Sequence, residues 1–380
     1  MSYSILRIYN LAYTNVFEEF IQKIDLKDYD YEKVAKLFFG LKVAYSNSFS
    51  RCMNDLHNKS EEIIFNLNYL QRLWNSKSNT NSNFEILLKQ IEEYKPDVIF
   101  FQGAPPISIR ELKMIKKKFP FIKKTVIHCG FQINDEILEE TDVLLLASPH
   151  LYNLYKEKIK NIHIIYHYFD EDVLNHVKLP SKKNYLVFCG KTGSLNNKDH
   201  YTRFNLLNKI CYNFDIKCYS QEFSKKENKP LSQFKTINLF LKRILKRDIF
   251  LHDNHLTKIL EPVFGLEMYQ KIIESHAVLN SHVNYNKEPL DFSANMRLFE
   301  ATGVGTAVFT ENSKNIYEIF NKDQIIVYKN DDDLISKINY YQNNLDELIV
   351  IGKKSQEHTL KFHTAKVRIK EINQLILNYL

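Results

Sequence analysis

SANMRLFEATGVGTAVFTE, the stretch from Ser293 to Glu311, predicts a short helix, a glycine turn and a buried strand. Ser293 or Asn295 can cap the helix, because a short side-chain oxygen accepts an otherwise unpaired backbone N–H group. Gly303 and Gly305 can end the helix and turn the chain. The apolar run that follows is short enough for a parallel strand. The stretch therefore favours an α/β fold.

Two charged residues lie within this stretch, one helical turn apart. Arg297 and Glu300 follow the expected helix start, where the helix N-terminus favours a phosphate group. A surface ion pair between positions i and i+3 is the alternative interpretation. Their spacing alone does not separate the two.

The same alternation of strands and helices extends through the whole chain. Strand-like runs of five to nine residues alternate with amphipathic segments, which is typical of βαβ units and of a parallel sheet covered on both faces. The clearest runs are Ser4–Tyr9, Asp97–Phe101, Lys124–His128, Asp142–Ala147, Asn161–Tyr168, Tyr185–Gly190, Asp215–Tyr219, Ala277–Tyr285 and Gln324–Tyr328. The polar segment VKLPSKKN, residues 177–184, is the best linker. We expect an N-terminal Rossmann-like domain at 1–178, a C-terminal one at 179–362 and a helix at 363–380 that crosses back.

Composition narrows the class of protein. The chain has 380 residues, of which 44% are hydrophobic and which include 26 Phe and 23 Tyr, enough for two or three folded domains. The net charge of +7 suits an anionic ligand and falls short of a nucleic-acid-binding protein. The five cysteines lack metal-ligand spacing, so we expect reduced thiols and no metal site. Without a secretory leader or an apolar run of about 20 residues, we expect a cytoplasmic protein.

Ligands of parallel sheets bind at the carboxyl ends of the strands, so the loops there are the candidate sites. In the second half these are GKTG at 190–193, NSHVN at 280–284 and the helix start before Glu300. They supply backbone N–H groups together with the side chains of Lys191, Arg203, Asn280, His282, Arg297 and Glu300. Such a set can hold a diphosphate by its donors and a ribose by its carboxylate. GKTG lacks the spacing of a Walker loop. The alternative interpretation of Arg203 is that it is a solvated residue on a helix.

In the first half, the strand ends supply Gln102, His128, His167 and Asp170. His128 can act as a general base, because its intrinsic pKa lies near neutrality, or it can make a structural hydrogen bond. Asp170 resembles a helix cap. The basic runs at 113–124 and 242–247 could contact anionic lipid, although a solvated helix face is the alternative.

Several motifs resemble the CgeB-like glycosyltransferases, a bacterial branch related to the group 1 glycosyltransferases. The likeness is strongest in PVFGLEMYQ (262–270), LNSH (279–282) and NMRLFEATGVG (295–305). Weaker likeness runs through NLNYLQRLW (66–74), KPDVIFF (95–101), HCG (128–130), YHYFDEDVL (166–174) and the Gly190–Arg203 arrangement. The resemblance thus covers nearly the whole chain.

This resemblance implies the GT-B fold, in which two Rossmann-like domains face a cleft and the C-terminal one holds a nucleotide-sugar donor. Glu300 would bind the donor ribose. Asn295, Arg297 and the loop of Gly190, Lys191 and Thr192 would hold the diphosphate. Val263, Phe264 and Gly265 would border the nucleobase, which we expect to be of the UDP type. Phe292 stands where many group 1 enzymes carry a first glutamate, so contacts to the donor sugar do not carry over.

The expected function is therefore transfer of a sugar from a nucleotide-sugar to a cell-surface glycan or a related lipid-linked or protein acceptor. Arg297 and the glycine loop would stabilise the leaving diphosphate without a cofactor or metal. The acceptor would bind the first domain near Gln102 and His128, with His128 as the base if the reaction inverts. We expect no nucleic-acid partner and at most a weak contact with the inner face of the membrane. A nucleotide-sugar 2-epimerase and a non-catalytic nucleotide-sugar-binding protein are the alternatives.

Overall fold

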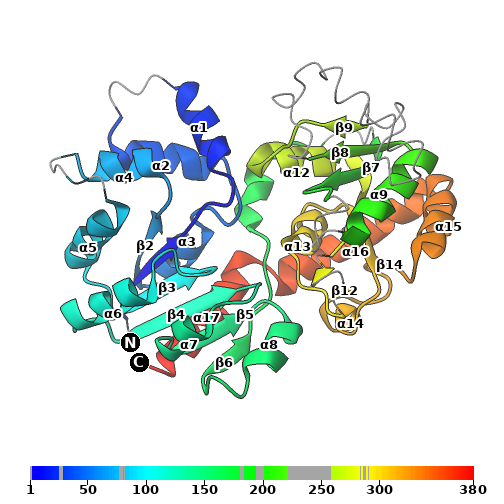
Figure 1. Ribbon diagram of the computed structural model, residues 1–380. Coiled ribbons are helices and arrows are strands. Elements are labelled where there is room, and N and C mark those ends of the chain that lie inside the picture. Colours follow the sequence, from blue (N-terminus) through cyan, green and yellow to red (C-terminus); the bar gives the residue numbers. More distant parts are fainter. Residues whose placement is uncertain are drawn as a thin grey trace, which may run out of the picture. The chain divides into compact units, whose positions relative to one another are not determined.

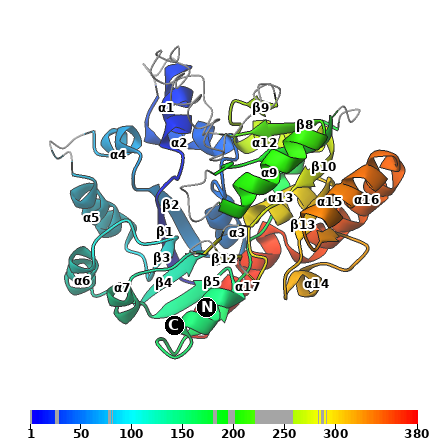
Figure 2. The same ribbon diagram turned by 45° about the vertical axis from the view of Figure 1, so that its right-hand side comes forward.

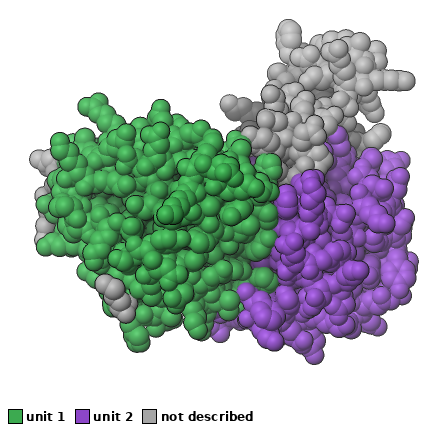
Figure 3. Space-filling view, turned by 90° about the horizontal axis from the view of Figure 1, so that it is seen from below, with its two compact units in different colours: residues 1–170, 363–380 green, residues 171–362 purple. Residues whose placement is uncertain are grey.

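The computed structural model describes residues 2–24, 29–76, 80, 82–179, 184–193, 201–220, 258–282, 284–285, 288–289 and 291–380. It shows two α/β units, which Figure 1 draws as ribbons and Figure 3 as surfaces. The first unit comprises residues 1–170 and 363–380, and the second comprises residues 171–362. None of the described helices combines the length and the apolar character needed to span a bilayer.

The first unit is built on a six-stranded parallel sheet in the order β2-β1-β3-β4-β5-β6. Its central strands are apolar on both faces, and Val98, Ile99, Phe100 and Phe101 of one strand are all fully buried. Such runs form parallel strands because helices cover both sides of the sheet. The strands are β1 (Ser4–Tyr9), β2 (Lys59–Ile64), β3 (Val98–Gln102), β4 (Lys124–Cys129), β5 (Val143–Leu146) and β6 (Ile162–Ile164).

Helices cover this sheet, as the two ribbon views show (Figure 1, Figure 2). Several begin with the caps that their sequences predict, for example the reciprocal Ser108–Glu111 capping box of α6. The C-terminal helix α17 packs against α3. Its Asn373 also accepts hydrogen bonds from Tyr3, just before β1, at 2.8 Å and from Asn58, just before β2, at 2.9 Å. The helices are α1 (Thr14–Gln22), α2 (Tyr31–Gly40), α3 (Ser48–Asp55), α4 (Asn68–Trp74), α5 (Asn83–Tyr94), α6 (Ile109–Lys118), α7 (Asp135–Glu139), α8 (Pro149–Tyr155) and α17 (Ala365–Leu377).

The chain leaves and re-enters the first unit at adjacent points. Phe169 pairs with Thr364 in an isolated parallel bridge, with the Phe169 N–H donating to His363 at 2.9 Å and the Ala365 N–H donating to Phe169 at 2.8 Å. The last helix therefore belongs to the first unit. The structure divides the chain at residue 170, where we had placed the boundary at residue 178.

The second unit is also built on a six-stranded parallel sheet, in the order β14-β13-β10-β7-β8-β9. Its strands are β7 (Asn184–Cys189), β8 (Ile216–Tyr219), β9 (Ile259–Leu260), β10 (Ser275–Leu279), β13 (Ala307–Glu311) and β14 (Ile326–Tyr328). A separate two-stranded hairpin joins β11 (Asn284–Tyr285) and β12 (Glu288–Pro289). The helices are α9 (Tyr201–Asn213), α12 (Gly265–Ile273), α13 (Met296–Gly303), α14 (Ile316–Ile319), α15 (Asp331–Gln342) and α16 (Leu345–Phe362), and a 3-10 helix spans Glu171–Asn175.

Two parallel sheets with covering helices confirm the predicted α/β class with two Rossmann-like units. The predicted strand Ala277–Tyr285 was too long, because the chain leaves the sheet after Leu279 and residues 280–282 form a buried loop. The predicted strand Asn161–Tyr168 is shorter too, at Ile162–Ile164. The predicted helix at 237–249, the basic run at 242–247 and residues 180–183 of the predicted linker lie outside the described residues.

Candidate functional site

The strand order of the second unit marks one position for a ligand. The chain first adds strands on one side of β7 and then, from β10 onward, on the other side. In open parallel sheets, ligands bind outside the carboxyl ends of the strands at the point where this direction reverses. The loops after β7 and β10 therefore define the candidate site.

The loop after β7 begins with a turn that requires glycine. Gly190 has a φ of +152°, and its N–H donates to the Tyr219 carbonyl at 3.0 Å. A Cβ at this position would lie 3.4 Å from the Phe188 ring. Thr192 is buried, and its N–H donates to the Ser220 hydroxyl at 3.3 Å. The predicted Gly190–Thr192 loop is thus a fixed turn at the carboxyl edge of the sheet.

Arg203 on α9 joins this loop to the next one. Its guanidinium donates to the Lys191 carbonyl at 3.0 Å and to the Ser281 carbonyl at 2.6 Å. It also lies over the Phe188 ring, 5.9 Å from the centroid. The residue is only 8% exposed. Arg203 is therefore not a solvated helix residue, since it holds two loops of the candidate site together.

The loop after β10 is fixed by a carboxylate that we did not predict. Glu311, at the end of β13, accepts from the Ser281 hydroxyl at 2.8 Å and from the His282 N–H at 2.8 Å. His282 is buried and its ring Nε2 lies 3.0 Å from the Ser293 hydroxyl, and burial lowers the pKa of this histidine. Glu311 could have been found from its position, because it too ends a parallel strand next to β10.

The start of α13 lies beside this loop. Asn295 is the N-cap residue, yet its side chain makes no capping bond and instead donates to the Asn280 side chain at 2.6 Å. Asn280 in turn donates to the Thr310 hydroxyl at 3.0 Å. Ser293, the other predicted cap, is bonded to a neighbouring loop instead. Its backbone N–H donates to the Asn315 side-chain oxygen at 2.7 Å. The predicted residues Asn280, His282 and Asn295 thus lie together.

Arg297 and Glu300 form an ion pair on α13, but not a surface one. Arg297 Nη1 lies 2.8 Å from Glu300 Oε2, and the two side chains are 17% and 7% exposed. The same nitrogen lies 2.7 Å from the Met268 sulfur on α12. Burial raises the pKa of the neighbouring Cys189 thiol to about 11, an effect that the positive charge of Arg297 opposes. The pair therefore sits beside the end of β7 in a largely buried position.

The predicted nucleobase border lies at the start of α12. Phe264 is the N-cap residue of that helix, and Gly265, its first residue, has a φ of +54°. Val263 is buried just before it. Since Met268 of the same helix contacts Arg297, the structure brings the starts of α12 and α13 together.

In the first unit, His128 and Gln102 are adjacent but His128 is inaccessible. His128 is fully buried, its Nε2 lies 2.9 Å from the Ile165 carbonyl and its Nδ1 lies 3.1 Å from the Gln102 amide. These partners fix the neutral tautomer with the proton on Nε2. Burial lowers its pKa to about 4. This geometry favours the structural hydrogen bond over the general base.

Two other predicted features of the first unit, Asp170 and the basic run at 113–124, take part in ion pairs. Asp170, which we expected to cap a helix, pairs with Arg51 and with Lys42, the latter at 3.3 Å. In the basic run at 113–124, Lys116 donates to the Glu140 carbonyl at 2.8 Å and Lys123 pairs with Asp97 at 2.9 Å. These contacts favour the solvated helix face. All five cysteines are free and buried, and the described residues contain no group of three or more His, Cys, Asp or Glu that could hold a metal ion.

The chain was compared with models of protein families and with curated protein sequences. Residues 238–374 match a family model described as glycosyl transferase-like. No curated protein sequence matches the chain.

Solved structures match the chain over its whole length. A glycosyltransferase from Rickettsia africae has a TM-score of 0.59 at 13% identity and covers 100% of this chain and 98% of its own. An α-glucosyltransferase in complex with UDP and a 13-mer DNA has a TM-score of 0.62 at 13% identity, with 99% and 100% covered. The Anabaena protein HepE in complex with UDP and glucose has a TM-score of 0.54 at 12% identity, with 99% and 100% covered. The chain therefore has the fold of the GT-B glycosyltransferases, and its C-terminal part resembles the glycosyl transferase-like family.

Proposed function

We propose that this protein is a nucleotide-sugar-dependent glycosyltransferase of the CgeB-like type, with its donor bound to the second unit. The observation that carries the proposal is the position of Arg297 and Glu300. The two side chains lie largely buried at the start of α13, beside the loops that follow β7 and β10. This is the strand-order reversal point at which ligands bind in such sheets.

The residues at this point suit the parts of a nucleotide diphosphate. The N-terminal N–H groups of α13 and the Arg297 guanidinium are donors for phosphate oxygens. A guanidinium has five N–H donors, so Arg297 can contact Glu300 and a phosphate at the same time. Glu300 then keeps an oxygen with which to accept from a ribose hydroxyl. The structures of similar fold that hold UDP favour a UDP-type donor.

Sugar transfer places negative charge on the departing diphosphate. Fixed donors that stabilise this charge as it develops lower the barrier. Arg297, the α13 N-terminus and the N–H groups of the Gly190–Thr192 loop would supply them, so the proposal requires no metal ion. We assign the acceptor, a cell-surface glycan or its carrier, to the first unit. His128 would support Gln102 there through their hydrogen bond and would not remove a proton.

Calorimetric titration with UDP tests the donor site. Arg297→Ala is expected to weaken UDP binding by about 1–3 kcal/mol, because it removes a charge-assisted hydrogen bond from a largely buried site. Arg110→Ala, at an exposed position on α6, is the matched control and should leave binding unchanged. Equal affinities for UDP in Arg297→Ala and the natural protein would contradict the assignment.

Turnover assays separate the proposed enzyme from its alternatives. A panel of UDP-sugars is incubated with and without acceptor glycans, and release of UDP and the fate of the sugar are measured. Release that depends on an acceptor supports a transferase. Accumulation of an epimerised free or nucleotide-linked sugar would identify an epimerase, and binding without release under every condition would identify a binding protein.

A further inference from the structure

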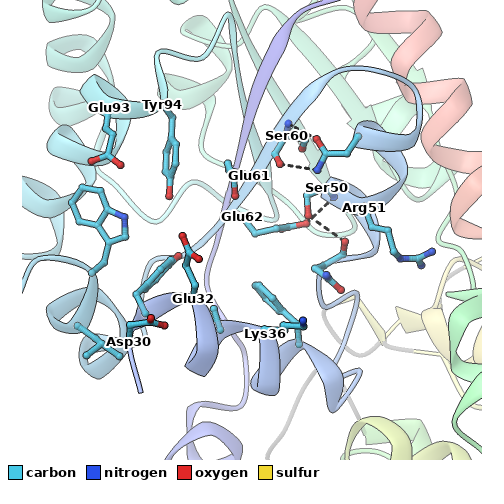
Figure 4. A pocket seen from close by; sticks show the side chains of 17 residues that line it. Asp30, Glu32, Lys36, Ser50, Arg51, Ser60, Glu61, Glu62, Glu93 and Tyr94 are labelled. Atoms are coloured by element: carbon cyan, nitrogen blue, oxygen red, sulfur yellow. Dashed lines mark hydrogen bonds between the residues drawn. The ribbon is translucent and has the colours of Figure 1, made fainter. Parts of the chain in front are cut away.

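The first unit contains a cavity that the proposed donor site does not use. It has a volume of about 760 Å³, within the range of small-molecule sites. It lies along β2, an edge strand of the sheet, and residues of α2, α3, α4 and α5 complete its wall (Figure 4).

The cavity carries more negative than positive charge. Of its carboxylates, Glu62 is neutralised by Arg7, which lies 2.9 Å away, and the lining Arg51 is neutralised by Asp170. Asp30, Glu32, Glu61 and Glu93 also line the cavity, and Lys36 is the cation that lines it beside them. Figure 4 shows the Glu32, Glu61 and Glu93 side chains around the same space, although they come from three different elements.

Among the described residues, the three glutamates have no ion-pair partner. Glu32, Glu61 and Glu93 form no ion pair with any residue in the part of the chain that the structure describes, and all three are exposed to a ligand. Partial burial raises the pKa of Glu61, and the neighbouring charges of Glu62 and Glu32 raise it further while Lys59 opposes them. Lys36 and Lys59 therefore offset only part of the negative charge around the cavity.

Aromatic rings and a buried hydroxyl complete the lining. Tyr31, Trp74 and Tyr94 all line the cavity. Ser60 lines it as well, is 2% exposed, and its hydroxyl has no hydrogen-bond partner among the described residues. A buried polar group without a partner is costly unless a ligand or water satisfies it. The Ser60 hydroxyl oxygen is itself inaccessible to solvent, so the aromatic rings, and not this hydroxyl, are what the cavity offers a ligand besides the carboxylates.

We propose that this cavity binds an organic ammonium cation. Carboxylates pair with ammonium groups, and aromatic faces attract them. A metal ion would use the carboxylates but neither the aromatic rings nor most of the volume. A neutral sugar would use the rings but would leave the negative charge uncompensated. The same ammonium chemistry is found in polyamines and in amino sugars.

Trp74 supplies a direct probe, because it is the only tryptophan of the chain and it lines the cavity. Its fluorescence is followed while the full-length protein is titrated with spermidine, glucosamine, glucose or Mg²⁺. A saturable change with spermidine or glucosamine is expected, weakening as NaCl is added. A response to spermidine alone identifies a polyamine site, whereas a response to glucosamine identifies an amino-sugar site.

Matched variants complete the test. Glu61→Gln and Glu93→Gln are each expected to raise the dissociation constant about two- to fivefold, since each removes one exposed carboxylate from the ion pairing. Glu139→Gln, at an exposed position on α7 outside the cavity, should have no effect. The proposal is overturned if glucose or Mg²⁺ gives the same response as the amines, if neither amine responds, or if both cavity variants bind like the natural protein. None of these results depends on donor binding by the second unit.

Discussion

Gly352 on α16 offers a quantitative test of how the structure supports the candidate site. A Cβ added at this glycine would lie 2.5 Å from the Gly305 carbonyl oxygen and 3.2 Å from the Ala307 nitrogen. Gly305 belongs to the turn that joins α13 to β13 and has a φ of +77°, and Ala307 is the first residue of β13. Glycine at position 352 therefore lets α16 approach the turn that follows the site helix.

The sign of the effect of Gly352→Ala follows from two opposed contributions. In an exposed helix the replacement stabilises by up to about 1 kcal/mol, because alanine has the higher helix propensity. Here the new methyl group meets backbone atoms, which cannot move away by a change of rotamer. Overpacking of this kind costs about 1–3 kcal/mol or more, and a separation of 2.5 Å places it at the upper end. The expected net result is a loss of about 2 kcal/mol.

Gly40→Ala is the matched control. Gly40 ends α2, and a Cβ there would have no heavy atom within 4 Å. This variant is expected to be as stable as the natural protein or more stable by a few tenths of a kcal/mol. Urea unfolding followed by far-UV circular dichroism measures both. If Gly352→Ala were as stable as Gly40→Ala, the close approach of α16 to the turn would be wrong.

Three further outcomes are expected. Glu62→Ala leaves the buried Arg7 without its partner and should lower the free energy of unfolding by about 3–5 kcal/mol, measured by Trp74 fluorescence in urea. Burial lowers the pKa of His128 to about 4 and that of His167 to about 3, from 6.5, so the folded state binds fewer protons than the unfolded state below pH 6.5. Stability is therefore complete above that pH and falls as the pH drops toward 4, by up to about 1.4 kcal/mol per pH unit for each histidine, and a flat urea midpoint from pH 7 to pH 5 would contradict this. Glu311→Gln should weaken UDP binding by about 1 kcal/mol in calorimetry, less than Arg297→Ala, because it loosens a loop of the site without touching the ligand.

The fold could be predicted because its signals are local. Buried strands such as Val98–Phe101 are continuous apolar runs, and α6 begins with a capping box that is visible in the sequence. The predicted end of the strand that begins near Ala277 was wrong. The predicted strand was extended past Leu279 into the mostly polar residues 280–285, whereas the Glu311 carboxylate holds Ser281 and His282 in a loop through contacts about 30 residues apart in the chain.

The candidate site was predictable in its residue types but not in their contacts. Strand-end reasoning identified Asn280, His282 and Arg203. It could not show that Arg203 donates to two loop carbonyls, since those partners come from different strands. It also left His128 as either a general base or a structural hydrogen-bond partner. The choice depends on how deeply the ring is buried, which spacing along the chain does not show.

The Arg297–Glu300 pair shows why the sequence left two interpretations open. An ion pair and a ligand site were treated as alternatives, but the structure contains the ion pair in a largely buried position, which is compatible with both. Two buried charges cost desolvation energy, and their mutual attraction only partly repays it, so a buried pair is a poor device for stability alone. It does hold both side chains in fixed positions at the start of α13. A diphosphate that binds there meets a guanidinium already desolvated and oriented, which reduces the ordering cost of binding.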